Sequence, residues 1–395
     1  MIPSAQEGST TKSAGTGLLD YTQVQLVTSL QEFLQVEIEY QRLAECADGF
    51  MFPSFRAEWI KVLQPIYFPT PHHTPFFVLV RRNGELIGAA MFRKVVRGMT
   101  PLAFRWLEFL GQHTGHSALD NLTGDFIVSS DADRELVIDA VCRALNGPLR
   151  ALWDGISLKR FCAYSTSLSA FLKAFPQARA VQEEMSGFVA ELGASFEDTW
   201  GQFDSKARKN LRRAIRLLDA SGLPYHFETR DEIDASLLGE ISVLHSGRQR
   251  LLKELGRNDR DDLLSGEVML DRVGELLRAM ARAGKLRIHL MRIDNALAAF
   301  SIVFGGRAGA NSWLVAFDEA FSRFSPSRLM FEHMYRQEIE RYGTPRVNLM
   351  LGHTQAKQDF SNRIYSSHTV EVLNVSSFSA RLKTESLRIF RRVMR

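Results

Sequence analysis

The residues best placed to do chemistry lie between a predicted strand, Ala310–Phe317, and the helix that follows it. Ser325 can cap this helix and a proline stands at its first position, a combination that favours a helix start. The unpaired N–H groups of such a start attract anions, and Arg328 adds a positive charge in the first turn. Because a cation there opposes the helix dipole, we expect a phosphate, or an acidic neighbour such as Glu332, to balance it. The pattern predicts an anion site on Ser325, Ser327 and Arg328.

A strongly basic segment lies near the middle of the chain, over residues 205–216. Its six cations, with no acid between them, are Lys206, Arg208, Lys209, Arg212, Arg213 and Arg216. Apolar residues recur on the opposite side at helical spacing, which predicts an amphipathic helix. One interpretation is a solvated helix face; the other is a seat for an anionic carrier such as coenzyme A, acyl carrier protein or nucleic acid. We expect the helix at the junction of the two halves of the chain, with its cations facing a cleft.

The composition of the 395 residues is that of an ordinary globular chain, with 24% charged residues and a net charge of +4. No apolar run approaches the roughly 18 residues of a transmembrane helix. The N-terminal segment lacks the pattern of a secretory signal, and the three cysteines form no CxxC pair, so we expect a cytoplasmic protein. The pairs His72-His73 and His113 with His116 have no carboxylate or cysteine to complete a set, so no metal site is predicted.

Two hairpin patterns recur 211 residues apart, which indicates an internal duplication. The first turn is Asn83-Gly84, within residues 76–96, and the second is Asp294-Asn295, within residues 285–305. Both lie between apolar runs, and Asn, Asp and Gly tolerate the positive φ angles of a hairpin turn. A predicted helix precedes each hairpin, and strands mix with helices after it. The predicted fold class is therefore α/β, or α+β with mixed sheets.

The predicted domain organisation has four parts. Residues 1–18 are small and polar, which predicts a disordered tail. Residues 19–194 form the first domain and residues 195–378 the second. Residues 379–395 form a basic C-terminal helix, either docked on the protein or in peripheral contact with a membrane.

Several short segments, in order from about residue 30 to 375, resemble the GNAT-type acyltransferases of the CelD/BcsL-like family, which are related to FemAB proteins and leucyl/phenylalanyl-tRNA–protein transferases. The segments are Phe52-Pro53-Ser54 with Glu58-Trp59, Gly84 and Gly88, Phe109-Leu110-Gly111, the helix from Ser205 to Arg213, Leu244-His245 with Arg248, Phe317-Asp318, Phe324-Ser325-Pro326, Leu351-Gly352 and Lys357. Their order and spacing carry the resemblance more than any one of them does. The resemblance implies two tandem GNAT-like domains.

The resemblance also implies acyl transfer from acetyl-CoA or another acyl-CoA to an amine or hydroxyl, often on a cell-envelope polysaccharide precursor or a small metabolite. The donor's pyrophosphate would lie on the loop 323–328, with Arg212 and Arg213 as further donor contacts. The chain departs from the family at two positions. The family often has Gly in place of Ser327, and Asp in place of Asn348. Because an Asn side chain cannot accept a proton as a base, the general base would lie elsewhere.

Acyl transfer needs a base and a group that stabilises the oxyanion. Asp318 is the leading candidate for the base, His353 is the second, and Lys357 is a candidate contact of donor or acceptor. A turn-capping Asp, a packed His and a surface Lys are the structural alternatives. The acceptor would be a sugar, an amine or a lipid precursor. Two other functions stay open: transfer from aminoacyl-tRNA, as FemAB relatives perform, and binding of coenzyme A or another anion without catalysis.

Overall fold

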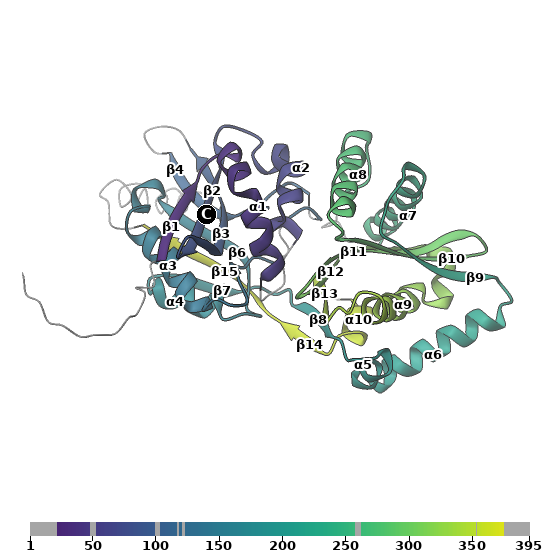
Figure 1. The fold of residues 1–395 in the computed structure, drawn as a ribbon. Helices are drawn as coiled ribbons and strands as arrows, with labels where there is room; N and C mark the ends of the chain where they lie inside the picture. The colour runs from purple at the N-terminus through teal and green to yellow at the C-terminus, as the bar shows by residue number, and fades with distance from the viewer. Residues whose placement is uncertain are drawn as a thin grey trace, which may run out of the picture.

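Two mixed β-sheets, each flanked by helices on both faces, make up the protein (Figure 1). The computed structural model describes residues 22–47, 53–98, 103–116, 118–120, 123–256, 262–352 and 354–374. The predicted tail 1–18 and the predicted basic helix 379–395 lie outside these ranges. Among the described helices, none combines the length and apolar character needed to cross a membrane.

The first sheet takes most of its strands from the N-terminal half. In spatial order they are β1 (Thr22–Val27), β2 (His73–Arg82), β3 (Glu85–Arg97), β4 (Phe104–Phe109), β6 (Gly155–Cys162), β15 (Ser367–Leu373) and β7 (Arg179–Gln182), with β5 (Ile127–Val128) beside β3. Its helices are α1 (Leu30–Cys46), α2 (Ala57–Tyr67), α3 (Arg134–Asn146) and α4 (Ser167–Ala174), with the short helices η1 (Pro53–Phe55) and η2 (Arg150–Leu152).

The second sheet repeats this arrangement. In spatial order its strands are β9 (Tyr225–Arg230), β10 (Leu286–Ile293), β11 (Ala296–Gly306), β12 (Gly309–Phe317), β13 (Arg346–Leu351), β8 (Gly187–Glu191) and β14 (Arg363–Tyr365). Its helices are α5 (Phe196–Gln202), α6 (Ser205–Ala220), α7 (Ala235–Glu254), α8 (Glu267–Arg282), α9 (Pro326–Glu340) and α10 (Gln355–Asp359), with η3 (Glu319–Phe324) before α9. In Figure 1, α7 and α8 lie on one side of the sheet, and α6 and α9 on the other.

The predicted duplication is confirmed by the register of the two hairpins. In β2–β3, Val80 faces Gly88 and a bulge follows; in β10–β11, Met291 faces Ala299 and the same bulge follows, 211 positions later. Both predicted turns have two residues with positive φ. Even a supporting ion pair recurs: Arg81 binds Glu39 of α1, and Arg292 binds Glu240 of α7.

The two sheets exchange one strand each. Strand β8, in the N-terminal half of the chain, pairs with β13 and β14 in the second sheet, and β15 pairs with β6 and β7 in the first. The chain therefore crosses between the sheets twice, once after β7 and once after β14. Residues 187–191, on the N-terminal side of the predicted division at residue 194, thus lie in the second sheet.

Aromatic packing and ion pairs join the two halves. The Trp59 ring of α2 meets Phe304 and Trp313 edge to face, at centroid distances of 5.4 and 5.3 Å. The indole N–H of Trp313 donates to the carbonyl of Ala118 at 2.8 Å, and Lys285 pairs with Glu45 at 2.6 Å. The basic helix α6 packs instead on α9 and η3, so our expectation that it lies at the junction is wrong (Figure 1).

Replacing Val370 of β15 by Ala tests whether the strand exchange supports the first sheet. Val370 is fully buried between β6 and β7, so we expect a loss of about 1–3 kcal/mol in the free energy of unfolding. We also expect faster amide hydrogen exchange in β6. Ile364→Ala is the control, because this residue of the neighbouring strand β14 is 63% exposed. Unchanged exchange in β6 would show that the first sheet does not depend on β15.

Candidate functional site

Each sheet contains one parallel strand pair that is hydrogen-bonded over two residue pairs only. In the second sheet Ala310 faces Val347 and Asn311 faces Asn348, after which β12 and β13 diverge. In the first sheet Trp106 faces Gly155 and Leu107 faces Ile156, after which β4 and β6 diverge. Toward the C-terminal ends of the two parallel strands the backbone pairing therefore stops, and we call this break in the hydrogen bonding the opening.

In the first domain, the chain itself fills this opening. The backbone N–H of Gly124 donates to the carbonyl of Arg160, and the N–H of Cys162 donates to the carbonyl of Gly124, both at 2.8 Å. Gly124 thereby bridges to β6 on the side from which β4 has turned away. A Cβ at this position would meet the Phe109 ring at 2.4 Å, so only glycine fits. No equivalent bridge to β13 exists in the described part of the second domain.

The segment after Gly124 replaces the second half of β4. Val128 and Ile127 of β5 face Gly88 and Ala89, just as Phe317 and Ala316 of β12 face Ala299 and Phe300. The next N–H donates to β3 or β11 in both domains: Ser129 to Ile87, and Asp318 to Ala298. Ser129 is thus the counterpart of Asp318, so the candidate base is found in the second domain and not in the first.

A small basic cavity lies where α6 meets the start of α9. It has a volume of about 290 Å³ and is lined by Asn210, Arg213, Ala214, Leu217, Arg323, Ser325 and Arg328. Three guanidinium groups therefore surround the N-terminus of α9. Three of the five residues that the sequence indicated for donor binding, namely Arg213, Ser325 and Arg328, come together here. Arg212 is exposed and Ser327 is half-buried, and neither is among the lining residues.

The local conformation opens the start of α9. Ser325 adopts a left-handed conformation, with φ of 53°, and its side chain makes no capping hydrogen bond. Arg328 is balanced by Asp359 of α10, which it contacts at 2.9 Å, and not by Glu332, which binds Arg336. The unfavourable position of the Arg328 cation in the first turn of α9 is therefore balanced by a carboxylate of the protein itself. Asp359 holds the Arg328 guanidinium beside the cavity.

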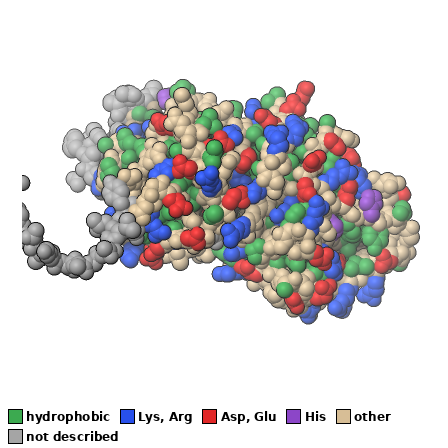
Figure 2. Space-filling model, viewed as in Figure 1, with side chains coloured by type: hydrophobic (Ala, Val, Ile, Leu, Met, Phe, Trp, Pro, Cys, Tyr) green, Lys and Arg blue, Asp and Glu red, His purple; other side chains and the backbone are tan. Residues whose placement is uncertain are grey.

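The exposed face of α6 continues this positive region. Figure 2 shows Lys and Arg side chains along the lower right edge of the second domain, where α6 lies. Within the part of the chain that the structure describes, the six α6 cations form no ion pair; Arg208 and Arg216 donate to backbone carbonyls instead. The mutual repulsion of these cations favours an anion close to the helix.

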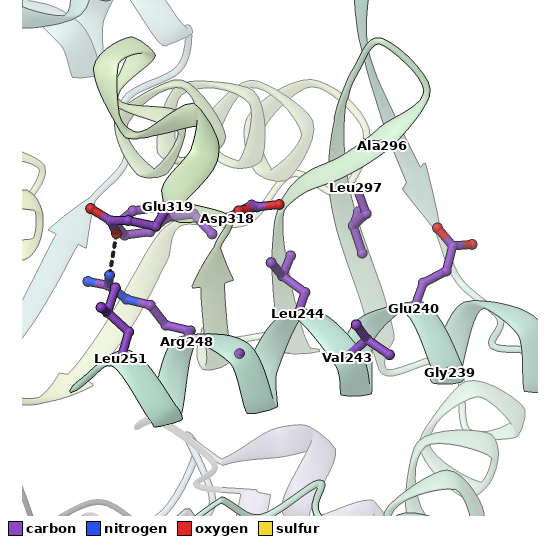
Figure 3. Close-up of a pocket in the computed structure, with 12 residues that line it drawn as sticks. Gly239, Glu240, Val243, Leu244, Arg248, Leu251, Ala296, Leu297, Asp318 and Glu319 are labelled. Atoms are coloured by element: carbon purple, nitrogen blue, oxygen red, sulfur yellow. Dashed lines mark hydrogen bonds and ion pairs between the residues drawn. The ribbon is translucent and has the colours of Figure 1, made fainter. Parts of the chain in front are cut away.

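A larger groove lies on the other side of η3, between α7 and the ends of β11 and β12 (Figure 3). Its volume is about 680 Å³, within the range of small-molecule sites. The residues from α7 are Gly239, Glu240, Val243, Leu244, Gly247, Arg248 and Leu251, and those facing them are Ala296, Leu297, Phe317, Asp318 and Glu319. We call it the α7 groove.

Asp318 lies on the wall of the α7 groove, above Leu244 in Figure 3. One carboxylate oxygen accepts from the N–H of Ala320 at 2.9 Å and caps η3, so the structural role that the sequence allowed is present. At the end of the groove, Arg248 pairs with Glu319 at 2.6 Å and stacks on the Phe317 ring at 4.2 Å. His245, one turn earlier, is buried against Asp262 and Gln249.

Of the other two catalytic candidates, the one that the structure describes, Lys357, lines neither cavity. Lys357 donates to the carbonyl of Leu351 at 2.8 Å, at the end of β13. His353 lies outside the described residues. Sequence reasoning missed Asn210 and Asp359, because no local pattern marks an Asn on a helix face or a carboxylate 31 positions after its Arg. The described residues hold no group of three His, Cys, Asp or Glu side chains arranged to bind a metal.

Asn348 takes part in a buried hydrogen-bond network where β12 and β13 diverge. Its amide donates to the side-chain oxygen of Asn311 at 3.2 Å, and its oxygen accepts from the N–H of Met350 at 2.9 Å and from the Tyr365 hydroxyl at 3.2 Å. Asn348 is fully buried. An amide satisfies this network because it both donates and accepts, which an ionised carboxylate cannot do.

Replacing Asn348 by Asp should therefore destabilise the protein in a pH-dependent way. Burial raises the pKa of the new carboxyl above its unfolded value of about 3.9, so stability is lost as the pH rises through the folded-state pKa. We expect a deficit of about 1–3 kcal/mol at pH 7 that shrinks toward pH 4, measured by denaturant unfolding against wild type. A deficit that is constant with pH would contradict this assignment of the hydrogen bonds.

The family comparison covers the second domain. Residues 205–358 match the family described as the acetyltransferase (GNAT) domain. No curated protein sequence matches the chain.

Solved structures are similar to this chain over most of its length at low sequence identity. FemX has 10% identity and a TM-score of 0.57, covering 84% of this chain and 95% of its own. A conserved protein from Bacteroides thetaiotaomicron has 10% identity and a TM-score of 0.53, covering 86% and 97%. A DUF2156 domain from Agrobacterium fabrum has 14% identity and a TM-score of 0.50, covering 90% and 96%. At these identities the likeness concerns the fold alone. Residues 205–358 are thus similar to the GNAT acetyltransferase domain, a unit with the same strand order precedes them, and the expected tandem α/β architecture is confirmed.

Proposed function

We propose that this protein transfers an acetyl or longer acyl group from acyl-CoA, bound to the second domain, to an amine or hydroxyl acceptor in the α7 groove. The basic cavity at the start of α9 is the observation that carries the proposal. Arg213, Arg323 and Arg328 surround a space of about 290 Å³ beside a helix N-terminus, which suits a diphosphate. The opening between β12 and β13 begins on the same sheet and would take the pantetheine arm.

In the described part of the first domain, the helix start that corresponds to α9 is unsuited to a phosphate. The Asp133 carboxylate caps α3 by accepting from the N–H groups of Glu135 and Leu136, and Glu135 adds a second negative charge in the first turn. A phosphate there would meet like charge instead of unpaired N–H groups. The opening between β4 and β6 is bridged by Gly124. We therefore place one donor on each chain, and the first domain acts as a support for the second.

In the proposed reaction, Asp318 accepts a proton as the acceptor's nitrogen or oxygen attacks the thioester carbonyl. The new C–N or C–O bond forms, the C–S bond breaks, and the proton passes to the departing thiolate. Asp318 lies at the start of η3, and Arg323 and Ser325 lie at its end. One short helix therefore separates the proposed base from the proposed phosphate site. Arg328 binds phosphate in this proposal, and Asp359 is its positioning residue.

Charge reversal at Arg213 tests the donor site. Arg213→Glu should raise the dissociation constant of coenzyme A tenfold or more, equivalent to about 1.4 kcal/mol, in calorimetric titration. Arg212→Glu is the matched control, because it makes the same charge change one residue away, at a position that does not line the cavity. Equal effects of the two changes would mean that α6 acts only through its overall charge. Unchanged affinity in both variants would place the donor elsewhere.

Asp318→Asn tests the base. The amide keeps the size of the side chain and its hydrogen bond from Ala320, but it cannot accept a proton. We expect coenzyme A affinity to stay within about twofold of wild type while turnover falls about 100-fold or more, measured by release of the donor thiol. Turnover close to wild type would remove Asp318 from the mechanism and leave it as the cap of η3.

A second candidate function is transfer from aminoacyl-tRNA, which the unpaired cations of α6 favour. Nucleic acid binding through this helix would weaken steeply with salt, because each phosphate contact releases counterions. Salt-sensitive tRNA binding without binding of coenzyme A would support this candidate. Heat stabilisation by coenzyme A without transfer to any acceptor would support a non-catalytic binding protein. The use of polysaccharide precursors as acceptors and the cytoplasmic location stay predictions.

A further inference from the structure

We infer that the acceptor in the α7 groove is an amine carried on an apolar chain or ring, and not a sugar. This inference rests on the proposed function and names the substrate class of the same site. It follows from the lining of the groove, from the hydrogen bonds that its polar groups already make, and from the charge of Asp318.

The lining of the groove is mainly apolar. Val243, Leu244 and Leu251 from α7 face Leu297 and Phe317. Val243 is 76% exposed, so its apolar surface is left to water unless something covers it. The groove runs along α7 from Gly239 to Leu251, roughly 18 Å at 1.5 Å per residue, which is long enough for an extended chain. Covering such a surface with an apolar chain stabilises a complex through the hydrophobic effect.

Most polar groups of the groove are held by partners within the protein. Both oxygens of Glu240 accept from Arg292, in the ion pair that has its counterpart in Arg81 and Glu39 of the first domain. Glu319 accepts from Arg248. Glu240 therefore belongs to the duplicated framework, and the negative charges of Glu240 and Glu319 are both balanced by Arg side chains.

Asp318 is the exception. Among the described residues no cation pairs with its carboxylate, which accepts one backbone N–H. A negative charge on the wall of an apolar groove attracts an ammonium group, and the same carboxylate then takes the proton that makes the nitrogen nucleophilic. As the amide bond forms and the C–S bond breaks, Asp318 passes its proton to the leaving thiolate and the nitrogen gives up a second proton to water, so that the donor departs as a free thiol.

Gly247 and Gly239 allow the groove to be blocked without disturbing the fold. A Cβ at either position would meet no atom within 4 Å, so a larger side chain there extends into the groove. Leu in place of a helical Gly also favours the helix, because Gly has the lower helix propensity. Loss of acceptor binding in such a variant cannot then be attributed to unfolding.

The experiment compares octylamine with glucosamine as acceptors for acetyl-CoA, following thiol release and the melting temperature of the donor-loaded protein. For wild type we expect a KM for octylamine at least tenfold below that for glucosamine. We also expect octylamine, and not glucosamine, to raise the melting temperature of the donor-loaded protein. Gly247→Leu should raise the octylamine KM tenfold or more, and Val243→Asn should raise it severalfold. The control is Gly201→Leu in α5, which also meets no atom within 4 Å and lies away from the groove.

A preference for glucosamine, or an unchanged octylamine KM in Gly247→Leu, would overturn the inference and leave the transferase proposal standing. Absence of thiol release with every acceptor would overturn the proposed function. The melting temperatures still decide the acceptor class in that case, because octylamine should stabilise the wild type and not Gly247→Leu. No stabilisation by octylamine would then overturn the inference as well.

Discussion

The exchange of β8 and β15 is the constraint on which both sheets depend. Strand β7 reaches the first sheet only through β15, and β14 reaches the second only through β8. Each half of the chain therefore leaves a gap beside its parallel strand that only the other half fills. This arrangement also fixes the divergent pairs β4–β6 and β12–β13, because each is bordered by an exchanged strand. Each sheet is therefore complete only when both halves have folded together.

The two domains share one strand order but differ at the divergent strands and at the helix that follows them. The first domain bridges its opening with Gly124, replaces the second half of β4 with β5, and caps α3 with an acidic side chain. The second domain keeps β12 continuous, starts α9 at a left-handed Ser325, and surrounds that start with three Arg side chains. The two domains therefore differ more in the charge at these helix starts than in the order of their strands. Phosphate would be repelled at α3 and attracted at α9.

Local patterns predicted the local structure well. The turns at Asn83 and Asp294, the basic helix over residues 205–216 and the strand before Asp318 were all readable, because each depends on neighbours in the sequence. The strand exchange was not, since β8 and β15 are short and pair with residues far away in the chain. The place of α6 and the pairing of Arg328 with Asp359 depend on packing across the second domain, which no single segment encodes.

The central claim is that the second domain alone binds the donor, with its diphosphate at the start of α9. A crystal structure of the full chain with coenzyme A tests this most directly. The account predicts one coenzyme for each chain, with the diphosphate within hydrogen-bond distance of Arg213, Arg323 or Arg328 and the thiol directed toward the opening between β12 and β13. A diphosphate at α3, or a coenzyme bound between the two domains, would contradict it.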